Sequence, residues 1–227
     1  TTESGERYAI PPYGRVVLVA GSSGSGKSTA TMALLEQVLE RGYQVCVVDP
    51  EGDYDNVEGA VVAGTSDQPP ELDQVMQILA RPQSHAIVNL MGVPLADRPS
   101  FFLKLLSRLQ EQRASAGRPH WIVVDEAHHV LGDEFEPARL AQPDALGSLV
   151  LITIEPERLQ RSLLARVDIG VFVGSEAPGS LGAFLLASGP PCPSAGAAPP
   201  CHSVPHEPDE DACAAEPDAC LATCGGE

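Results

Sequence analysis

The chain has 227 residues, which is long enough for one well-buried α/β domain and little more. It carries 31 acidic against 14 basic residues, a formal net charge of −17. Neutralising nucleic-acid phosphates needs clustered Lys and Arg, so this charge does not support DNA as a partner, although it leaves room for a local basic pore. No stretch approaches the roughly 18 apolar residues of a membrane span, and no secretory leader is visible at the N-terminus. We therefore expect a cytoplasmic protein with no membrane partner.

The composition changes abruptly after residue 188. Residues 189–227 hold eight prolines, seven acidic residues and no Lys or Arg, which leaves 24 acidic and 14 basic residues, a net charge of −10, in residues 1–188. A segment with so few large apolar side chains cannot bury a core. We expect residues 1–14 to be a lead-in, residues 15–188 to form the one folded domain, and residues 189–227 to be a disordered tail.

Five of the six cysteines lie in this tail, together with two histidines: Cys192, Cys201, Cys213, Cys220, Cys224, His202 and His206. Their spacings match no common zinc-ligand pattern, and no CxxC occurs, so disorder is favoured over a zinc site, and both interpretations stay open. Cys46 lies within an expected strand, where a free buried thiol is the ordinary interpretation.

Apolar runs alternate with helical patterns along the rest of the chain. The second of these runs, residues 43–49, is almost continuously apolar, which is typical of a strand in a parallel sheet that is covered on both faces. The alternation predicts an α/β fold, a mostly parallel, doubly wound sheet with helices on both faces. We expect strands at residues 15–20, 43–49, 60–63, 86–90, 121–125, 147–153 and 167–173, and helices at residues 27–41, 70–79, 97–114, 156–166 and 180–187.

The first strand is joined to the first helix by a loop that matches G-x-x-x-x-G-K-[ST]: Gly21-Ser22-Ser23-Gly24-Ser25-Gly26-Lys27-Ser28-Thr29. Small residues let the backbone curl around a phosphate chain, and the helix that follows adds the positive end of its dipole. Lys27 can reach the β- and γ-phosphates, and the Ser28 hydroxyl can bind Mg²⁺. The strand–loop–helix context disfavours a chance Gly/Ser loop, so the sequence predicts a site for ATP and Mg²⁺.

The expected strand at residues 121–125 ends in Asp125-Glu126 after four apolar residues. Parallel strands bring their carboxyl ends to one edge of the sheet. If this strand lies beside the phosphate-loop strand, Asp125 comes close to the Mg²⁺, and Glu126 can orient and deprotonate a water for attack on the γ-phosphate. The weaker alternative is a pair of solvated acids at a strand end.

Two further groups of polar residues follow expected strands. Either one of His128 and His129 couples to the nucleotide or to Glu126, or they are plain surface histidines. Thr153 and Glu155 sense the γ-phosphate, or Glu155-Pro156 simply opens a helix. We leave both pairs of interpretations open.

Four carboxylates after the second strand form an acidic rim at the same edge: Asp49, Glu51, Asp53 and Asp55. They hold a substrate, a partner or a metal-bound water, or they are a solvated turn rich in Asp and Gly. We favour a functional rim slightly, because such strand ends face the site.

Three segments of the chain resemble the HerA/FtsK-like P-loop ATPases, and in particular the central domain of HerA-type helicases: GSSGSGKST, VVDPEGDY and IVVDEAHHVL. The resemblance covers about residues 15–174 and implies a RecA-like (ASCE) P-loop NTPase fold. It implies that Lys27 and Ser28 bind the triphosphate and Mg²⁺, that Asp125 holds Mg²⁺, and that Glu126 is the catalytic base. It also implies a homo-oligomer, a hexameric ring that pumps DNA or protein, with an arginine from the neighbouring subunit completing each site.

Two departures weaken the motor interpretation but not the ATPase one. The family usually has a glutamine at the sensor strand, where this chain has Thr153, and the accessory domains and basic surface of a DNA pump are missing. A regulatory ATPase is therefore as reasonable as a motor. Four arginines are candidate fingers, with nothing to single one out: Arg139, Arg158, Arg161 and Arg166.

Two other functions compete with ATP hydrolysis. A small-molecule kinase uses the same phosphate loop, and Asp49 and Asp53 are placed to position an acceptor hydroxyl. No Arg-rich lid is visible, however, and Glu126 as a base beside Asp125, the aspartate of a Walker B motif, suits attack by water. The third hypothesis is a nucleotide-dependent binding module with no useful turnover.

Overall fold

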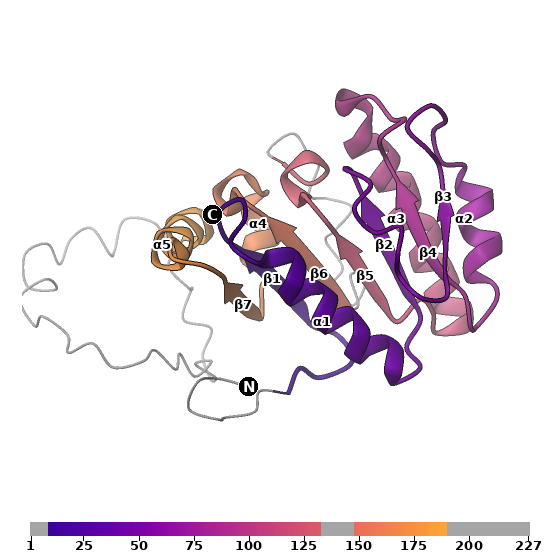
Figure 1. The fold of residues 1–227 in the computed structure, drawn as a ribbon, viewed down its shortest axis with the longest axis horizontal. Coiled ribbons are helices and arrows are strands. Elements are labelled where there is room, and N and C mark those ends of the chain that lie inside the picture. The colour runs from indigo at the N-terminus through magenta and orange to yellow at the C-terminus, as the bar shows by residue number, and fades with distance from the viewer. Residues whose placement is uncertain (1–8, 133–147, 190–227) are drawn as a thin grey trace, which may run out of the picture. The chain divides into compact units, whose positions relative to one another are not determined.

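The computed structural model describes residues 9–132 and 148–189, all of which belong to one compact unit, Thr1–Gly189. The unit is built on a seven-stranded sheet of order β3-β4-β2-β5-β6-β1-β7, in which all neighbouring strands run parallel (Figure 1). The parallel α/β sheet expected from the sequence is therefore confirmed. The strands are β1 Val16–Ala20, β2 Val45–Asp49, β3 Ala60–Ala63, β4 His85–Asn89, β5 Trp121–Val124, β6 Ser148–Thr153 and β7 Ile169–Phe172.

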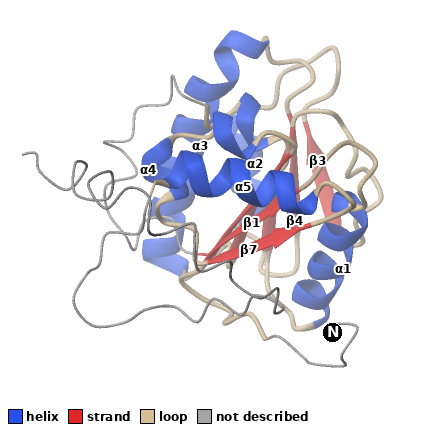
Figure 2. Ribbon diagram, turned by 90° about the vertical axis from the view of Figure 1, so that its left-hand side faces the viewer, coloured by secondary structure: helices blue, strands red, loops and turns tan. Residues whose placement is uncertain are grey.

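Helices cover both faces of the sheet, as expected (Figure 2). One face packs against α1, and the other packs against the helices α2 to α5. The α-helices are α1 Lys27–Glu40, α2 Leu72–Leu79, α3 Arg98–Ala116, α4 Arg161–Leu164 and α5 Ala177–Ser188, and three short 3-10 helices are η1 Leu95–Asp97, η2 Ala127–His129 and η5 Pro156–Arg158.

The two-residue period of a strand divides the apolar side chains between two cores. In β1, Leu18 and Ala20 point to the side of α2 to α5, whereas Val17 and Val19 point to the side of α1. All five residues of β1 are buried, as are all five of β2 and all six of β6. This double burial explains why the central strands read as unbroken apolar runs.

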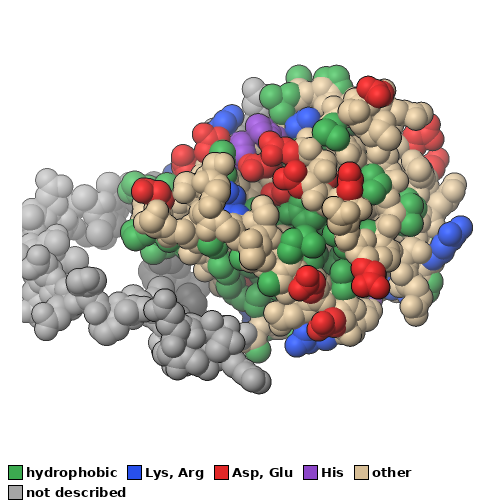
Figure 3. Space-filling model, viewed as in Figure 1, with side chains coloured by type: hydrophobic (Ala, Val, Ile, Leu, Met, Phe, Trp, Pro, Cys, Tyr) green, Lys and Arg blue, Asp and Glu red, His purple; other side chains and the backbone are tan. Residues whose placement is uncertain are grey.

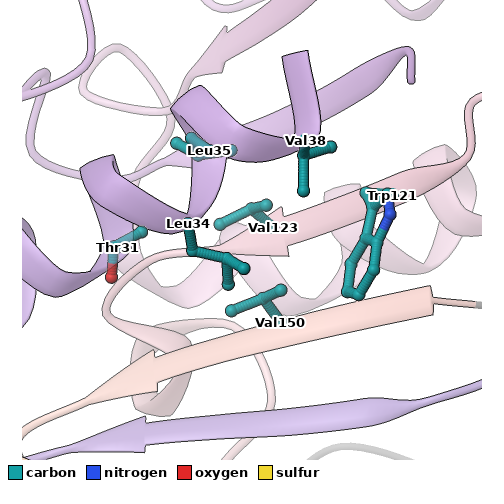
Figure 4. A pocket seen from close by; sticks show the side chains of 7 residues that line it. All are labelled: Thr31, Leu34, Leu35, Val38, Trp121, Val123 and Val150. Carbon is teal, nitrogen blue, oxygen red and sulfur yellow. The ribbon is translucent and has the colours of Figure 1, made fainter. Parts of the chain in front are cut away.

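The helix α1 is held against the middle of the sheet by its apolar side. Figure 4 shows this contact, in which side chains of α1 lie over side chains of β5 and β6. The residues involved are Thr31, Leu34, Leu35 and Val38 of α1, Trp121 and Val123 of β5, and Val150 of β6. Because α1 begins at Lys27, this packing also fixes the position of the phosphate loop relative to the strands.

A partly buried arginine, Arg113, ties α3 to the amino-terminal edge of the sheet, opposite the edge that carries the phosphate loop. Arg113 donates from Nε to the carbonyl of Pro119 at 2.7 Å and from Nη2 to the carbonyls of His120 and Ser148 at 3.2 and 3.3 Å. Burial lowers the pKa of Arg113 to about 10, which leaves it charged at neutral pH. Its fork of N–H groups therefore satisfies carbonyls at the starts of β5 and β6.

The continuous helix expected at residues 156–166 is wrong. The segment forms η5, then an extended Leu159 with φ −74° and ψ 146°, and then the short α4. Leu159 is 1% exposed and pairs with Gly132 in an antiparallel bridge. Burying Leu159 against the segment after η2 overrides the local helical pattern.

The remaining expected elements differ from the structure only at their ends, and some expectations concern residues that the structure does not describe. The second strand begins at Val45 rather than residue 43, and α5 begins at Ala177, three residues early. Cys46 is a buried free thiol, as expected. Among residues 9–132 and 148–189, no helix is long and apolar enough to cross a membrane. The tail with its cysteines, most of the lead-in, and Arg139 lie outside the described residues.

Candidate nucleotide-binding site

The sheet order corrects one expectation about the site. The strand β5, which leads to Asp125, does not lie beside β1, because β6 lies between them. Apolar runs of similar length cannot be ordered from their sequence, since any of them suits the middle of a parallel sheet. The registers place Ala20 level with Thr153, and Val124 level with Leu151. The tip of β6 therefore separates the phosphate loop from Asp125 and Glu126 at the carboxyl edge.

The phosphate loop forms a compact turn that leads directly into α1. Gly24 and Gly26 have φ of +71° and +98°, which glycine adopts without strain. The N–H of Ser25 bonds to the carbonyl of Ser22 at 3.2 Å. Lys27 is 8% exposed, and its Nζ bonds to the same carbonyl at 3.0 Å, so the ammonium is held across the loop.

The beginning of α1 fits a phosphate group. Its N-cap is Gly26, and no side chain accepts a bond from the first N–H groups of the helix. These N–H groups are therefore available to an anion, and the helix dipole favours one. The Ser25 hydroxyl is buried without a hydrogen-bond partner among the described residues, while Ser28 and Thr29 are exposed. The donors, the buried lysine and the small residues together suit a triphosphate.

The residues that follow β7, Val173 and Gly174, pack against the phosphate loop. No sequence pattern indicates this contact. A Cβ on Gly21 would collide with the carbonyl oxygen of Val173, and a Cβ on Gly174 would lie 2.6 Å from the Cβ of Ser25. The N–H of Val173 also bonds to the carbonyl of Ala20 at 2.8 Å. The contact brings together segments about 150 residues apart, and only the fold reveals it.

Asp125 and Glu126 turn the chain sharply after β5. Asp125 is 7% exposed, and its Oδ1 accepts the N–H of Glu126 at 2.8 Å. Burial raises the pKa of Asp125, against the opposing effect of this N–H bond. Ser28 supplies a hydroxyl and Asp125 a carboxylate, and oxygen ligands of these two kinds suit Mg²⁺. Among the described residues, no group of three or more His, Cys, Asp or Glu side chains is placed to hold a metal without other ligands.

Glu126 has the features of a base held out of water. It is the non-glycine residue with positive φ among those described, at φ 39° and ψ 50°. Its Oε2 is buried and accepts no hydrogen bond of good geometry. Burial, followed by the charges of Asp125 and Glu51, raises its pKa to about 7, and the charge of Lys27 opposes this shift. Lys27 and Glu126, nearly 100 residues apart in sequence, thus lie within electrostatic reach of each other.

The two histidines have different surroundings. His128 is buried, with its Nδ1 3.0 Å from the Thr153 hydroxyl and 3.3 Å from Oε2 of Glu126. Burial and then the neighbouring His129 lower the pKa of His128 to about 4, so its contact with Glu126 is not a salt bridge at neutral pH. The structure therefore places His128 beside Glu126. His129 is partly exposed and stacks on His128 at a ring distance of 4.1 Å.

The sensor candidates at the tip of β6 are already engaged. The Thr153 hydroxyl accepts the N–H of Glu155 at 3.0 Å and contacts His128. Glu155 precedes η5, and its carboxylate pairs with Arg158 at 2.7 Å. Glu155-Pro156 thus does begin a short helix, and Arg158 is paired within its own chain.

The loop after β2 is built around one buried carboxylate. Asp49 is 0% exposed, and it accepts the N–H groups of Glu51, Gly52, Asp53 and Tyr54 at 2.7 to 3.2 Å. Asp49 is therefore structural rather than part of an open rim. The sequence reasoning gave no role to Tyr54, whose hydroxyl is buried, and whose pKa is raised by burial and by Asp125.

Acidic side chains nevertheless gather at this edge. Figure 3 shows them beside the histidines on the face seen in Figure 1. Glu51, Asp53 and Glu155 are among the carboxylates whose charges act on Asp125 or Glu126. A bound cation is the natural counterpart of such a concentration of negative charge.

Comparison with known proteins agrees with this geometry. Residues 14–78 match the family model described as the central domain of helicase HerA. The predicted resemblance to that family is therefore confirmed, and the match covers the phosphate loop, α1 and the loop built on Asp49. No curated protein matches the chain.

Several solved structures share the fold. The genome packaging NTPase B204 of Sulfolobus turreted icosahedral virus 2, in complex with ATP-gammaS, has a TM-score of 0.56 and 16% identity over 79% of this chain and 84% of that chain. The same protein with AMPPCP gives 0.55 and 15%, over 77% and 83%. The DNA-packaging ATPase B204 of Sulfolobus turreted icosahedral virus gives 0.53 and 14%, over 77% and 83%. At these identities the likeness shows a shared P-loop NTPase fold.

Proposed function

We propose that this HerA-like P-loop domain is a magnesium-dependent ATP hydrolase, acting as a motor or as a regulatory ATPase. The observation that carries the proposal is Glu126. It is a carboxylate with a raised pKa and one buried oxygen that accepts no hydrogen bond of good geometry from the described residues, and it lies within electrostatic reach of the phosphate-loop Lys27. A base with a pKa near the working pH is effective in taking a proton from water.

The phosphate loop binds the triphosphate in this proposal. Backbone N–H groups from Gly21 to Thr29 surround the phosphates, and Lys27 leaves the carbonyl of Ser22 to reach the β- and γ-phosphates. Ser28 and Asp125 would hold Mg²⁺, which when bound neutralises charge on the phosphate oxygens. The match to the HerA central domain over residues 14–78 supports the assignments of Lys27 and Ser28.

Glu126 acts on the water. It orients a water molecule and accepts its proton as the water oxygen bonds to the γ-phosphorus. The bond from the γ-phosphorus to the bridging oxygen breaks, and that oxygen leaves with ADP. Burial, and after it the charges of Asp125 and Glu51, keeps the pKa of Glu126 high, which strengthens it as a base.

One protein of similar structure, B204 of Sulfolobus turreted icosahedral virus, is a DNA-packaging ATPase, which supports testing DNA as the moved substrate. The net charge of −17 offers no generic DNA surface. A homo-oligomeric ring with a neighbour's arginine at each site is part of the motor form of this proposal.

The test is ATP turnover by the full chain with Mg²⁺, with and without duplex DNA, for the wild type, E126Q and K27A. The matched control is E157Q, which changes an exposed glutamate of η5. We expect E126Q to lower kcat by about 100-fold or more while still binding ATP, K27A to lose ATP binding, and E157Q to match the wild type.

Stimulation by DNA would favour the motor, and its absence would favour the regulatory form. ATP binding with no phosphate release under any condition would overturn the hydrolase and leave a nucleotide-dependent binding module. ATP turnover by E126Q at the wild-type rate would exclude Glu126 as the catalytic base and would favour a phosphotransferase.

A further inference from the structure

His128 joins the loop after β5 to the tip of β6. Its side chain is 3% exposed, so its three polar contacts are made in the interior. On one side of the ring, Nδ1 lies 3.0 Å from the Thr153 hydroxyl and 3.3 Å from Oε2 of Glu126. On the other side, Nε2 lies 3.6 Å from Oε2 of Glu155. One imidazole thus contacts the proposed base and two residues at the end of β6.

Glu126 depends on its surroundings for its position. Its backbone is in the left-handed region, which residues other than glycine rarely adopt. Its buried oxygen accepts no hydrogen bond of good geometry that would fix the carboxylate. Residues in sparsely populated backbone regions persist only where neighbouring groups hold them. The His128 ring is the neighbour that the structure places against the carboxylate.

The contacts of Thr153 fix the orientation of the ring in turn. The Thr153 hydroxyl oxygen accepts the N–H of Glu155 at 3.0 Å, and its second lone pair can accept the ring N–H of His128. Burial keeps His128 neutral at pH 7 through its lowered pKa. With the ring proton on Nδ1, one N–H group faces both the Thr153 hydroxyl oxygen at 3.0 Å and Oε2 of Glu126 at 3.3 Å.

The tip of β6 is the part of the sheet that adjoins the phosphate loop. Thr153 is level with Ala20, the residue before Gly21. A displacement of this tip when the loop closes on a triphosphate would move the hydroxyl that holds His128. We propose that His128 is a positioning residue, which aligns the carboxylate of Glu126 with the tip of β6 through Thr153. This inference rests on the proposed hydrolase function.

The activity test compares two sets of variants. H128N keeps a polar atom near the position of Nδ1, H128Q places one near Nε2, and H128A keeps neither. T153S keeps the hydroxyl, and T153V keeps the shape without it. E157Q, which changes an exposed glutamate of η5, is the control.

We expect H128A and T153V each to lower kcat by roughly 10- to 100-fold, with KM for ATP changed by less than about threefold. H128N and T153S should retain most of kcat, and H128Q should not. The double variant H128A/T153V should be no slower than the worse single variant, because both break one connection. Wild-type kcat in H128A, or equal losses in H128N and H128A, would overturn the proposal.

A second measurement does not depend on turnover. The ¹⁵N signals of His128 in the full chain, assigned by their loss in H128N, should shift in both T153V and E126Q and stay unchanged in E157Q. A response to one partner but not the other would overturn the connection. Absent hydrolysis by the wild type would overturn the proposed function instead, and this measurement would still decide whether His128 links the two residues.

Discussion

The carboxylate of Asp49 accepts the N–H of Tyr54 at 3.1 Å, five residues along the chain, while its other oxygen accepts three N–H groups between them. A residue that reads from the sequence as part of an open acidic rim thus builds the loop beside the site. The same arrangement places the Tyr54 ring, which is 3% exposed, in the core on the side of α1.

This arrangement predicts that D49A destabilises the protein. The substitution leaves four N–H groups without their acceptor, and hydrogen bonds to a charged group contribute about 1.5–3 kcal/mol each, although they do not add fully. We expect a loss of about 3 kcal/mol in the free energy of unfolding, measured by urea denaturation. The exposed Asp55 in D55A is the control, and equal denaturation midpoints for D49A and D55A would contradict the structural role.

The packing of β7 on the phosphate loop makes a second prediction. Gly174 has φ +94°, and an added Cβ would lie 2.6 Å from the Cβ of Ser25, so G174A should displace the loop and weaken ATP binding by about tenfold or more. Gly117 has φ +69° with nothing within 4 Å of such a Cβ. G117A therefore imposes similar backbone strain without the collision. The affinities of G174A and G117A for ATP are compared by titration with a fluorescent ATP analogue. Equal affinities would show that the contact between Gly174 and Ser25 is unimportant for binding.

His128 and Glu126 should give stability opposite dependences on pH. The pKa of His128 is lowered by burial from 6.5 to about 4, so its contribution is present above pH 6.5 and lost as the pH falls towards 4. The pKa of Glu126 is raised from 4.5 to about 7, mainly by burial, so its contribution is present below pH 4.5 and lost as the pH rises through 7.

The single variants should separate these two effects. In E126Q, relative to the wild type, the unfolding free energy should rise more steeply between about pH 4.5 and 7, because the opposing glutamate is gone. In H128N the slope should change in the opposite direction. Urea denaturation at several pH values in this window measures both slopes, and a change of the same sign in the two variants would be inconsistent with these shifts.

Arg113 should stabilise the protein far more than a surface arginine of the same helix. In R113M the carbonyls of Pro119, His120 and Ser148 lose a partly buried donor, which we expect to lower the free energy of unfolding by about 2 kcal/mol. Arg108 pairs with Asp73 at the surface, with 43% and 78% of the two side chains exposed, so R108M should cost less than about 0.5 kcal/mol. The free energies of unfolding of the two variants are compared by thermal and urea denaturation. A small loss of stability in R113M would mean that water replaces the guanidinium as the donor to these carbonyls.

The local elements followed from the sequence because each depends on near neighbours. Fully apolar runs indicated strands buried on two faces, and the loop from Gly21 to Thr29 has the strand before it and the helix after it that its pattern requires. The helix expected at residues 156–166 failed because Leu159 is buried through a distant partner, Gly132. Local propensity carries no information about such a contact.

The sequence by itself determined the parallel α/β fold and the residue types that make a phosphate loop and an acidic strand end, since these depend on short-range pattern and chemistry. Only the tertiary structure decided that β6 lies between β1 and β5, because apolar strands of similar length are interchangeable until the whole sheet packs. The tertiary structure alone also placed His128 beside Glu126 and Thr153. It likewise showed that Asp49 binds the backbone of its own loop instead of lying in an open acidic rim. These contacts are set by which strand ends meet at one edge, and that depends on the packing of the whole domain.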